Sequence, residues 1–278
     1  MTTERIDAHH HLWRYDPAEY PWISDEMSIL RRDFAPEDLL KDAKSSAVSG
    51  FIAVQASQSL EETWALLKSA EAHPAICGVV GWAPLISPDL NHILPTIANH
   101  PRLKGIRHIV QDEPDPDYIL REDFNRGVRE LRPYHLVYDI LIFERHLPQT
   151  IEFVDRHPDQ VFVLDHIAKP KIRDGEISPW RERFRDLTRR PNVYCKLSGL
   201  VTEAKASWTE QELQPFIEIA IDAFTPQRIM FGSDWPVCLL AASYERWVEV
   251  VESSIGRLSP TEQARIWSGT AREAYRLQ

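Results

Sequence analysis

The sequence has few cysteines, no long apolar stretch and fewer basic than acidic residues. Its three cysteines, Cys77, Cys195 and Cys238, lie far apart and form no CxxC pair, which argues against the dense, even-numbered framework of a small secreted protein. No run of about 18 apolar residues occurs, so we expect no transmembrane helix and no membrane partner. Lysine and arginine total 32 against 42 aspartates and glutamates, a formal net charge of −10. This sign argues against non-specific binding to nucleic acid, which requires cations to neutralise phosphates.

The first residues also lack the features of a signal peptide, because they are too few and too polar before Ile6. We therefore expect a cytoplasmic protein. Hydrophobic residues make up 43% and charged residues 27% of the chain, which is ordinary for a globular domain. Nine tryptophans and ten phenylalanines are enough to fill a large core.

Short apolar segments alternate with amphipathic ones along the whole chain. Several of the apolar segments are nearly continuous, as at 51–54 and 161–164, a pattern typical of parallel strands buried on both faces. The expected strands are 5–9, 50–55, 76–83, 103–110, 136–143, 161–168, 193–200 and 228–234. The expected helices, from their 3.6-residue periodicity, are 60–72, 87–99, 124–131, 147–156, 179–188, 210–224, 244–254 and a terminal helix from Ser259 towards Tyr275.

Eight strand–helix units in fewer than 300 residues predict a single-domain (β/α)8 TIM barrel over residues 1–278. A doubly wound open sheet is the second possibility, but no GxGxxG follows any expected strand. Residues 14–33, rich in aromatics and prolines, are interpreted as a long loop after the first strand that lies over the mouth of the barrel.

The first candidate site residues are His9 and His11. Alternation along a strand places both on one side and His10 on the other. Two imidazoles on one face can bind a metal or can both bind one substrate oxyanion, whereas a chance histidine cluster is the simplest alternative. An expression tag would be longer and would not lie inside an apolar strand.

Two further candidates lie where expected strands end. His166 closes the sixth strand, and polar side chains at that end of a barrel line the active site. Asp234 closes the eighth strand, which neighbours the first in a closed barrel. A carboxylate beside histidines or a metal stays ionised and can take a proton from an attacking water. The structural alternatives are a hydrogen-bonded core histidine and a turn aspartate before Trp-Pro.

Six segments together resemble the amidohydrolase superfamily, and within it the branch of lactone-opening enzymes that includes sugar-lactone lactonases and pyrone-dicarboxylate lactonase. The segments run from the first strand to the last: 7–13 (DAHHHLW), 104–107 (KGIR), 138–141 (YDIL), 165–170 (DHIAKP), 196–199 (KLSG) and 231–236 (FGSDWP). The resemblance implies a barrel hydrolase that adds water to a carbonyl. It assigns His9 and His11 to the first-strand pair, His166 to the sixth-strand histidine and Asp234 to the general base. Arg107 matches a position that binds or polarises the substrate.

One departure from the superfamily limits the metal content. Members with two metals bridge them with a lysine or glutamate from the fourth strand and use a histidine from the fifth. Here the fourth strand ends in Arg107-His108-Ile109, and residues 136–143 contain no histidine at their end. We therefore expect either one divalent ion, with zinc the first candidate for ligands His9, His11, His166 and Asp234, or no metal.

Other residues allow two interpretations each. Arg107 either contacts substrate or pairs with a barrel carboxylate such as Asp139. Lys169 and Lys196 either pair with sugar oxygens or carboxylates near the mouth, or lie on the surface or behind the residues that contact substrate. Trp13, with Tyr15, Tyr20 and Trp22, forms either an apolar wall for a sugar ring or ordinary loop packing. Cys238 has no recognisable base beside it and is interpreted as a small buried apolar residue.

The predicted function is hydrolysis of a small lactone, most simply an aldonolactone of a sugar such as fucose, rhamnose or galactose. A dicarboxylate lactone would require several arginines near the mouth, and Arg107 alone is well placed. Two alternatives are a metal-dependent decarboxylase of the same superfamily and a sugar-binding barrel without catalysis. The base position of Asp234 argues against a pure binding protein.

Overall fold

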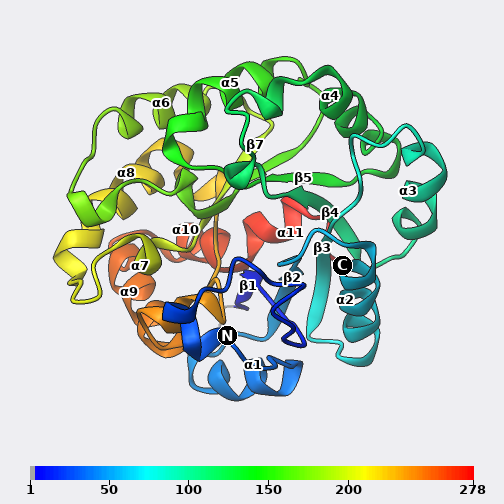
Figure 1. Ribbon diagram of the computed structural model, residues 1–278. Helices are drawn as coiled ribbons and strands as arrows, with labels where there is room; N and C mark the ends of the chain where they lie inside the picture. The colour runs from blue at the N-terminus through cyan, green and yellow to red at the C-terminus, as the bar shows by residue number, and fades with distance from the viewer. Residues whose placement is uncertain (1–3) are drawn as a thin grey trace.

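A computed structural model describes residues 4–278 and shows eight parallel strands in one sheet, in the order β1 to β8. The strands curve into a barrel, and helices cover its outside (Figure 1). The strands are β1 (Ile6–His10), β2 (Gly50–Val54), β3 (Ile76–Gly81), β4 (Leu103–His108), β5 (Val137–Ile140), β6 (Phe162–Leu164), β7 (Val193–Leu197) and β8 (Ile229–Phe231). The predicted (β/α)8 barrel is confirmed.

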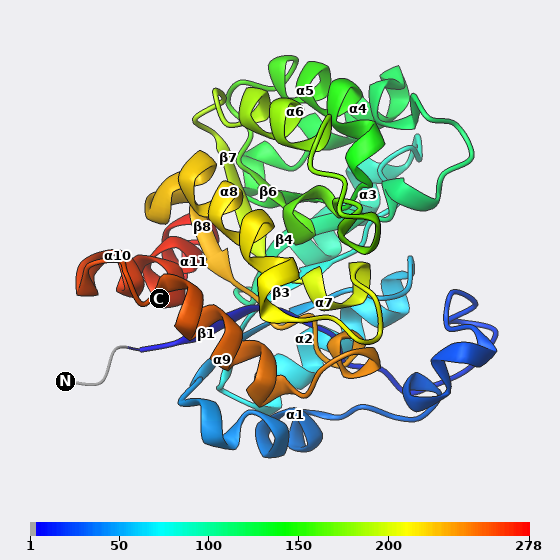
Figure 2. The same ribbon diagram turned by 90° about the vertical axis from the view of Figure 1, so that its left-hand side faces the viewer.

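The outer helices follow the strands in sequence, and Figure 2 shows them stacked around the sheet. They are α1 (Pro36–Asp42), α2 (Leu60–Ala72), α3 (Leu90–Ala98), α4 (Glu122–Arg129), α5 (Leu147–Asp155), α6 (Trp180–Leu187), α7 (Leu200–Glu203), α8 (Glu210–Arg228), α9 (Tyr244–Ile255), α10 (Pro260–Ala264) and α11 (Thr270–Ala274). No helix among residues 4–278 is long and apolar enough to cross a membrane.

Two kinds of expectation about the elements were wrong. Helix α3 begins at Leu90 rather than at residue 87, and the helices α1 and α7 were not predicted from the sequence. The fifth to eighth strands end at Ile140, Leu164, Leu197 and Phe231, three or four residues before the predicted ends. Residues that follow these ends, including His166, Gly199 and Asp234, have positive φ values, which no strand accommodates. The apolar composition continues there because the residues remain buried, although the backbone has already turned.

The seam between β8 and β1 closes the barrel through a few specific bonds. Asp234 N donates to His9 O over 2.8 Å, and His11 N donates to Trp235 O over 2.6 Å. Behind them, the buried Asp7 carboxylate accepts hydrogen bonds from Ser233 N at 2.8 Å and from Ser233 Oγ at 2.5 Å. The seam therefore fixes the first strand and the turn that carries Asp234 relative to one another.

Candidate active site

His9 and His11 lie side by side on the inner face of the first strand. Their Nε2 atoms are 3.2 Å apart, and both rings are buried. His10 points the other way, and its ring meets the edge of Phe51 with the ring centroids 5.7 Å apart. Strand alternation alone therefore predicted correctly which two of the three histidines share a face.

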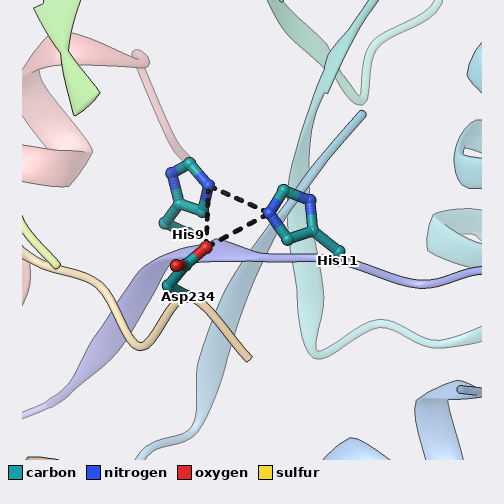
Figure 3. A group of neighbouring side chains, drawn as sticks. All are labelled: His9, His11 and Asp234. Atoms are coloured by element: carbon teal, nitrogen blue, oxygen red, sulfur yellow. Dashed lines mark hydrogen bonds and ion pairs between the residues drawn. The ribbon is translucent and has the colours of Figure 1, made fainter. Parts of the chain in front are cut away.

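Asp234 completes a triangle with these histidines (Figure 3). Its Oδ1 atom lies 3.3 Å from His11 Nε2 and 3.6 Å from His9 Nε2. The residue has a left-handed backbone, with φ of 60°, which aspartate tolerates better than most side chains. This backbone turn aims the carboxylate inward immediately after β8 ends.

His166 approaches the same carboxylate from the turn after β6. Its Nε2 atom lies 3.8 Å from Asp234 Oδ1, and its Nδ1 atom lies 2.9 Å from Ser198 Oγ. The backbone from His166 to Lys169 is left-handed at four successive residues, with φ between 47° and 63°. Such a run is rare, and it includes the β-branched Ile167, for which positive φ is strained. Strain of this kind persists only where the surrounding structure enforces it.

Gly199 leaves the space that His166 occupies. Its φ is +70°, and a Cβ atom placed there would lie 2.5 Å from His166 Nδ1. Glycine alone tolerates both the backbone angle and the contact. The third residue of the KLSG segment thus supports the histidine ring with Ser198 Oγ, while the fourth makes room for it.

The three ligand atoms of His9, His11 and Asp234 fit one tetrahedral ion. In a tetrahedron with metal–ligand bonds of about 2.1 Å, the ligand atoms are about 3.4 Å apart. The observed separations are 3.2, 3.3 and 3.6 Å. His166 Nε2 lies near the carboxylate as a further donor. The residue types and spacing therefore suit a divalent ion that prefers nitrogen and oxygen ligands, such as zinc.

Burial keeps the imidazoles of His9 and His166 neutral, as metal binding requires. It lowers the pKa of His9 well below the ordinary value and that of His166 to about 4, although Asp165 raises the pKa of both rings and Asp234 that of His166. Burial alone would raise the pKa of Asp234, but His166, His11 and His9 hold it below its ordinary value. At neutral pH the site therefore combines the neutral imidazoles of His9 and His166 with the ionised carboxylate of Asp234.

A buried charge network lies behind His9. Arg107 Nη1 donates to Asp165 Oδ2 over 2.9 Å and lies 3.3 Å from His9 Nε2. Asp165 Oδ1 lies 3.3 Å from His9 Nδ1 and 3.0 Å from Lys196 Nζ. Lys196 also donates to Asp139 Oδ2 over 2.5 Å. Two cations and two carboxylates thus neutralise one another in the barrel interior, which is the condition for tolerating buried charges.

This network corrects one alternative proposed for Arg107. Its carboxylate partner is Asp165, and Asp139 instead pairs with Lys196. Arg107 also has a second role, because it lines the cavity above the histidines. Asp165 was not predicted as a site residue, although it lies in the DHIAKP segment. Its position beside His166, at the end of a buried strand, was the feature of the sequence that could have indicated a role.

A cavity of about 110 Å³ opens above this cluster, at the carboxyl ends of the strands. In TIM barrels the active site lies at this end. The cavity is lined by His11, Trp22, Ala56, Arg107, Ile109, Gln111, Asp112, Leu141, His166, Lys169, Asp234 and Val237. Its volume is below the roughly 300 Å³ of pockets for drug-sized ligands, so it suits a small, single-ring molecule.

A larger hollow of about 630 Å³ lies at the opposite end, beside the starts of β5 and β6. None of the predicted site residues lines it. Of its arginines, Arg132 pairs with Asp159 and Arg129 pairs with Glu122, both on the exposed surface. The chemistry therefore belongs to the smaller cavity.

The remaining candidates divide between the cavity and the packing around it. Lys169 lines the cavity, and its Nζ atom lies 3.9 Å from Glu203 Oε1. Trp13 does not line it: the indole is buried and donates to Arg32 O over 2.9 Å, within the first loop. Trp22 is the aromatic residue of this loop that faces the cavity. Cys238 is buried, and burial raises the pKa of its thiol well above the ordinary value, as expected for a residue without a nucleophilic role.

Comparison with known proteins identifies the family of this chain. The family model described as amidohydrolase matches residues 6–277. A Burkholderia multivorans protein named L-fucono-1,5-lactonase is 42% identical over 291 residues, which cover 100% of this chain and 97% of the relative. A Burkholderia ambifaria protein of the same name is 35% identical over 279 residues, covering 99% of this chain and 96% of the relative.

A solved structure supports the same grouping. The crystal structure of an amidohydrolase from Burkholderia multivorans with bound zinc has a TM-score of 0.95 and 43% identity to this chain, covering 99% of this chain and 100% of that one. Because the match covers 99% of this chain, it includes the first strand with His9 and the turns that carry His166 and Asp234. By its sequence and its fold, the chain belongs to the amidohydrolase family.

Proposed function

We propose that this protein is a hydrolase that opens the lactone of a small sugar acid, with Asp234 as the general base. The observation that carries the proposal is the position of Asp234 Oδ1, within 3.8 Å of an Nε2 atom from each of His9, His11 and His166. The relatives named L-fucono-1,5-lactonase support an aldonolactone as the substrate class. The small cavity also suits a single sugar ring.

We propose that His9, His11, His166 and Asp234 hold one zinc ion, in line with the zinc bound in the related Burkholderia multivorans structure. When bound, zinc supplies Lewis acidity that polarises a carbonyl and makes water more acidic. The protein's own groups perform the remaining steps.

The substrate carbonyl carbon is attacked by water, and the Asp234 carboxylate accepts the proton that this water loses. Arg107 Nη1 faces the histidine cluster and stabilises the negative charge that develops on the carbonyl oxygen. The ester C–O bond then breaks, and Asp234 returns the proton to the ring oxygen as it leaves. The products are an open-chain hydroxy acid and a regenerated site.

The test is a panel of sugar lactones in a weakly buffered pH-indicator assay, because ring opening releases acid. Wild-type protein is expected to hydrolyse at least one aldonolactone. Asp234→Asn should lower turnover by about 10²–10⁴-fold, the usual contribution of a general base, while circular dichroism and the melting temperature stay close to wild type. Asp159→Asn, at an exposed ion pair with Arg132, is the control.

A chelator arm tests the metal separately. Removal of zinc, confirmed by elemental analysis, should lower activity, and added zinc should restore it. Full activity of zinc-free protein would contradict the proposed ion but not the base. Near-wild-type turnover by Asp234→Asn would contradict the mechanism, and release of CO₂ from an aromatic acid in place of lactone opening would favour the decarboxylase alternative.

A further inference from the structure

Glu62 occupies the third position of helix α2, but its carboxylate does not form the usual capping bond. Ser59 caps α2, and its Oγ accepts a hydrogen bond from Glu62 N over 3.0 Å. In a complete capping box the glutamate carboxylate returns to the backbone N–H of the cap residue. Glu212 does so at the start of α8, bonding Thr209 N over 2.8 Å, and Glu262 does so at the start of α10. The Glu62 carboxylate turns away from its cap and into the barrel mouth.

There the Glu62 carboxylate joins two loops. It accepts hydrogen bonds from Ala56 N at 3.0 Å and Ser57 N at 2.9 Å, in the turn between β2 and α2. It also accepts one from Tyr20 OH at 3.1 Å, in the long first loop. Glu62 is 6% exposed. A carboxylate buried this deeply is tolerated because several donors satisfy it.

The turn that Glu62 holds positions side chains that line the cavity. Three successive carbonyl groups at the end of β2 each accept a hydrogen bond from a side chain lining the cavity. Val54 O lies 2.8 Å from His11 Nδ1, Gln55 O accepts from Arg107 Nη2, and Ala56 O accepts from Trp22 Nε1 over 2.9 Å.

The three carbonyls differ in what fixes them. Val54 lies in the strand and is registered against β3, and Gln55 N donates to Val80 O over 2.8 Å. Beyond this point the sheet no longer holds the chain, and the amides of Ala56 and Ser57 bond to Glu62 instead. Loss of the carboxylate should therefore disturb Ala56 and Trp22, whereas Val54 and His11 stay anchored by the sheet.

We propose that Glu62 is a positioning residue that fixes Trp22 and Ala56 as the wall of the cavity and thereby sets how tightly the substrate binds. This inference rests on the proposed lactonase function for the identity of the substrate. Glu62 acts through Ala56 and Trp22. It does not contact the histidines or Asp234, so its effect belongs to substrate binding rather than to the chemical step.

The experiment compares Glu62→Gln with Glu212→Gln, which alters a glutamate at the same helix position but outside the barrel mouth. Both are assayed with the best lactone at about pH 8, where the Glu62 carboxylate of the wild type is mostly ionised. Glu62→Gln should raise KM roughly tenfold and change kcat less than about threefold. Glu212→Gln should leave both constants unchanged.

Hydrogen exchange gives a readout that needs no substrate. In Glu62→Gln the peptide that contains the amides of Ala56 and Ser57 should exchange faster, because these amides lose a charged acceptor. Peptides from the α8 start should be unaffected. If Glu62→Gln does not fold, Tyr20→Phe, which removes one of the three donors, should raise KM by a smaller factor of about threefold.

Wild-type KM in Glu62→Gln, or a fall in kcat with unchanged KM, would overturn the inference. Unchanged exchange of Ala56 and Ser57 would also overturn it. If the wild type opens no lactone at all, the proposed function fails instead, and the exchange measurement alone decides whether Glu62 holds the wall.

Discussion

At the residue scale, each imidazole of the site divides its two nitrogens between two tasks. Nε2 of His9, His11 and His166 points to Asp234, while the Nδ1 atoms lie 3.3 Å from Asp165 Oδ1, 2.8 Å from Val54 O and 2.9 Å from Ser198 Oγ. Such outer partners fix the tautomer and the orientation of a metal-binding histidine. The partner is a carboxylate for His9, a backbone carbonyl for His11 and a hydroxyl for His166.

Ser198 gives a direct test of this arrangement. Ser198→Ala removes the partner of His166 Nδ1, and we expect a loss of about 10–100-fold in zinc affinity or activity, the typical effect of removing an outer-shell hydrogen bond. Competition with a fluorescent chelator measures the affinity. Ser254→Ala is the matched control, because this buried hydroxyl donates to Val250 O within its own helix. Equal zinc affinity in both variants would show that Ser198 does not hold His166.

At the element scale, the site combines residues of two strands, His9 in β1 and Arg107 in β4, with residues of the turns that follow β6 and β8. The turn after β6 holds four left-handed residues in succession, and the turn after β8 holds Asp234 in the same conformation. Both turns are buried, since His166 and Asp234 are each 4% exposed and Ile167 is fully buried. Contacts such as the hydrogen bond between His166 Nδ1 and Ser198 Oγ therefore maintain their unfavourable backbone angles.

Alanine substitutions at two glycines distinguish the effect of backbone strain from the effect of displacing His166. Gly199 and Gly175 have φ values of +70° and +68°, but a Cβ atom at Gly175 meets nothing within 4 Å. Substitution by alanine should cost each protein about 1 kcal/mol for the left-handed backbone. Gly199→Ala should in addition push His166 aside and lower kcat/KM by at least about tenfold. Comparable activity of Gly199→Ala and Gly175→Ala would contradict this role of Gly199.

At the scale of the whole molecule, ionisable groups buried near the mouth of the barrel contribute to the free energy of unfolding. Arg107, Lys196, Asp139 and Asp165 are buried together in the barrel, and they balance one another in charge. Glu62 is a further buried acidic residue, and its carboxylate accepts a hydrogen bond from the backbone amide of Ala56. Burial raises the pKa of Glu62 from 4.5 to about 7, although its hydrogen bonds from Ser57, Ala56 and Tyr20 and the charge of Arg107 lower it.

The raised pKa of Glu62 predicts a stability that depends on pH. Between pH 4.5 and about 7 the folded protein retains a proton on Glu62 that the unfolded chain releases, so this group's contribution to the free energy of unfolding falls as pH rises through that window. One pKa unit is worth about 1.4 kcal/mol, so the fall totals roughly 3 kcal/mol.

Glu62→Gln lacks this titration. Urea unfolding at both ends of the window should show the stability of the wild type, relative to Glu62→Gln, decreasing as pH rises. Glu212→Gln should follow the wild-type profile. A difference between the wild type and Glu62→Gln that does not change with pH would show that Glu62 titrates as an ordinary exposed glutamate.

Much of the molecule was predictable from local pattern. The eight strands, the helix start at Ser259 and the shared face of His9 and His11 follow from the periodicity of apolar residues and from side-chain direction. The positions of His166 and Asp234 at the mouth followed from their place at strand ends. The strand ends themselves were predicted too late, because burial continues into turns whose backbone is no longer extended.

Other features depend on residues distant in the sequence. The choice of Trp22 over Trp13 for the cavity wall is decided by the hydrogen bond to Ala56 O, and no periodicity in the first loop distinguishes the two. The pairing of Arg107 with Asp165 rather than Asp139 depends on which strands are neighbours and how their side chains point. Glu62 matched an ordinary helix start in the sequence, and the fold turned its carboxylate towards the mouth.

The sequence by itself determined the barrel and the identity of the groups that meet at its mouth, because hydrophobic periodicity and strand alternation act over a few residues. The tertiary structure alone decided the protonation state of His9 and its distance from His11. Closure of the barrel buries His9 against Asp234, Asp165 and Lys196, and this burial keeps its imidazole neutral. The same closure holds the Nε2 atoms of His9 and His11 3.2 Å apart. Desolvation and distances across the barrel are properties of the folded chain, and no stretch of sequence contains them.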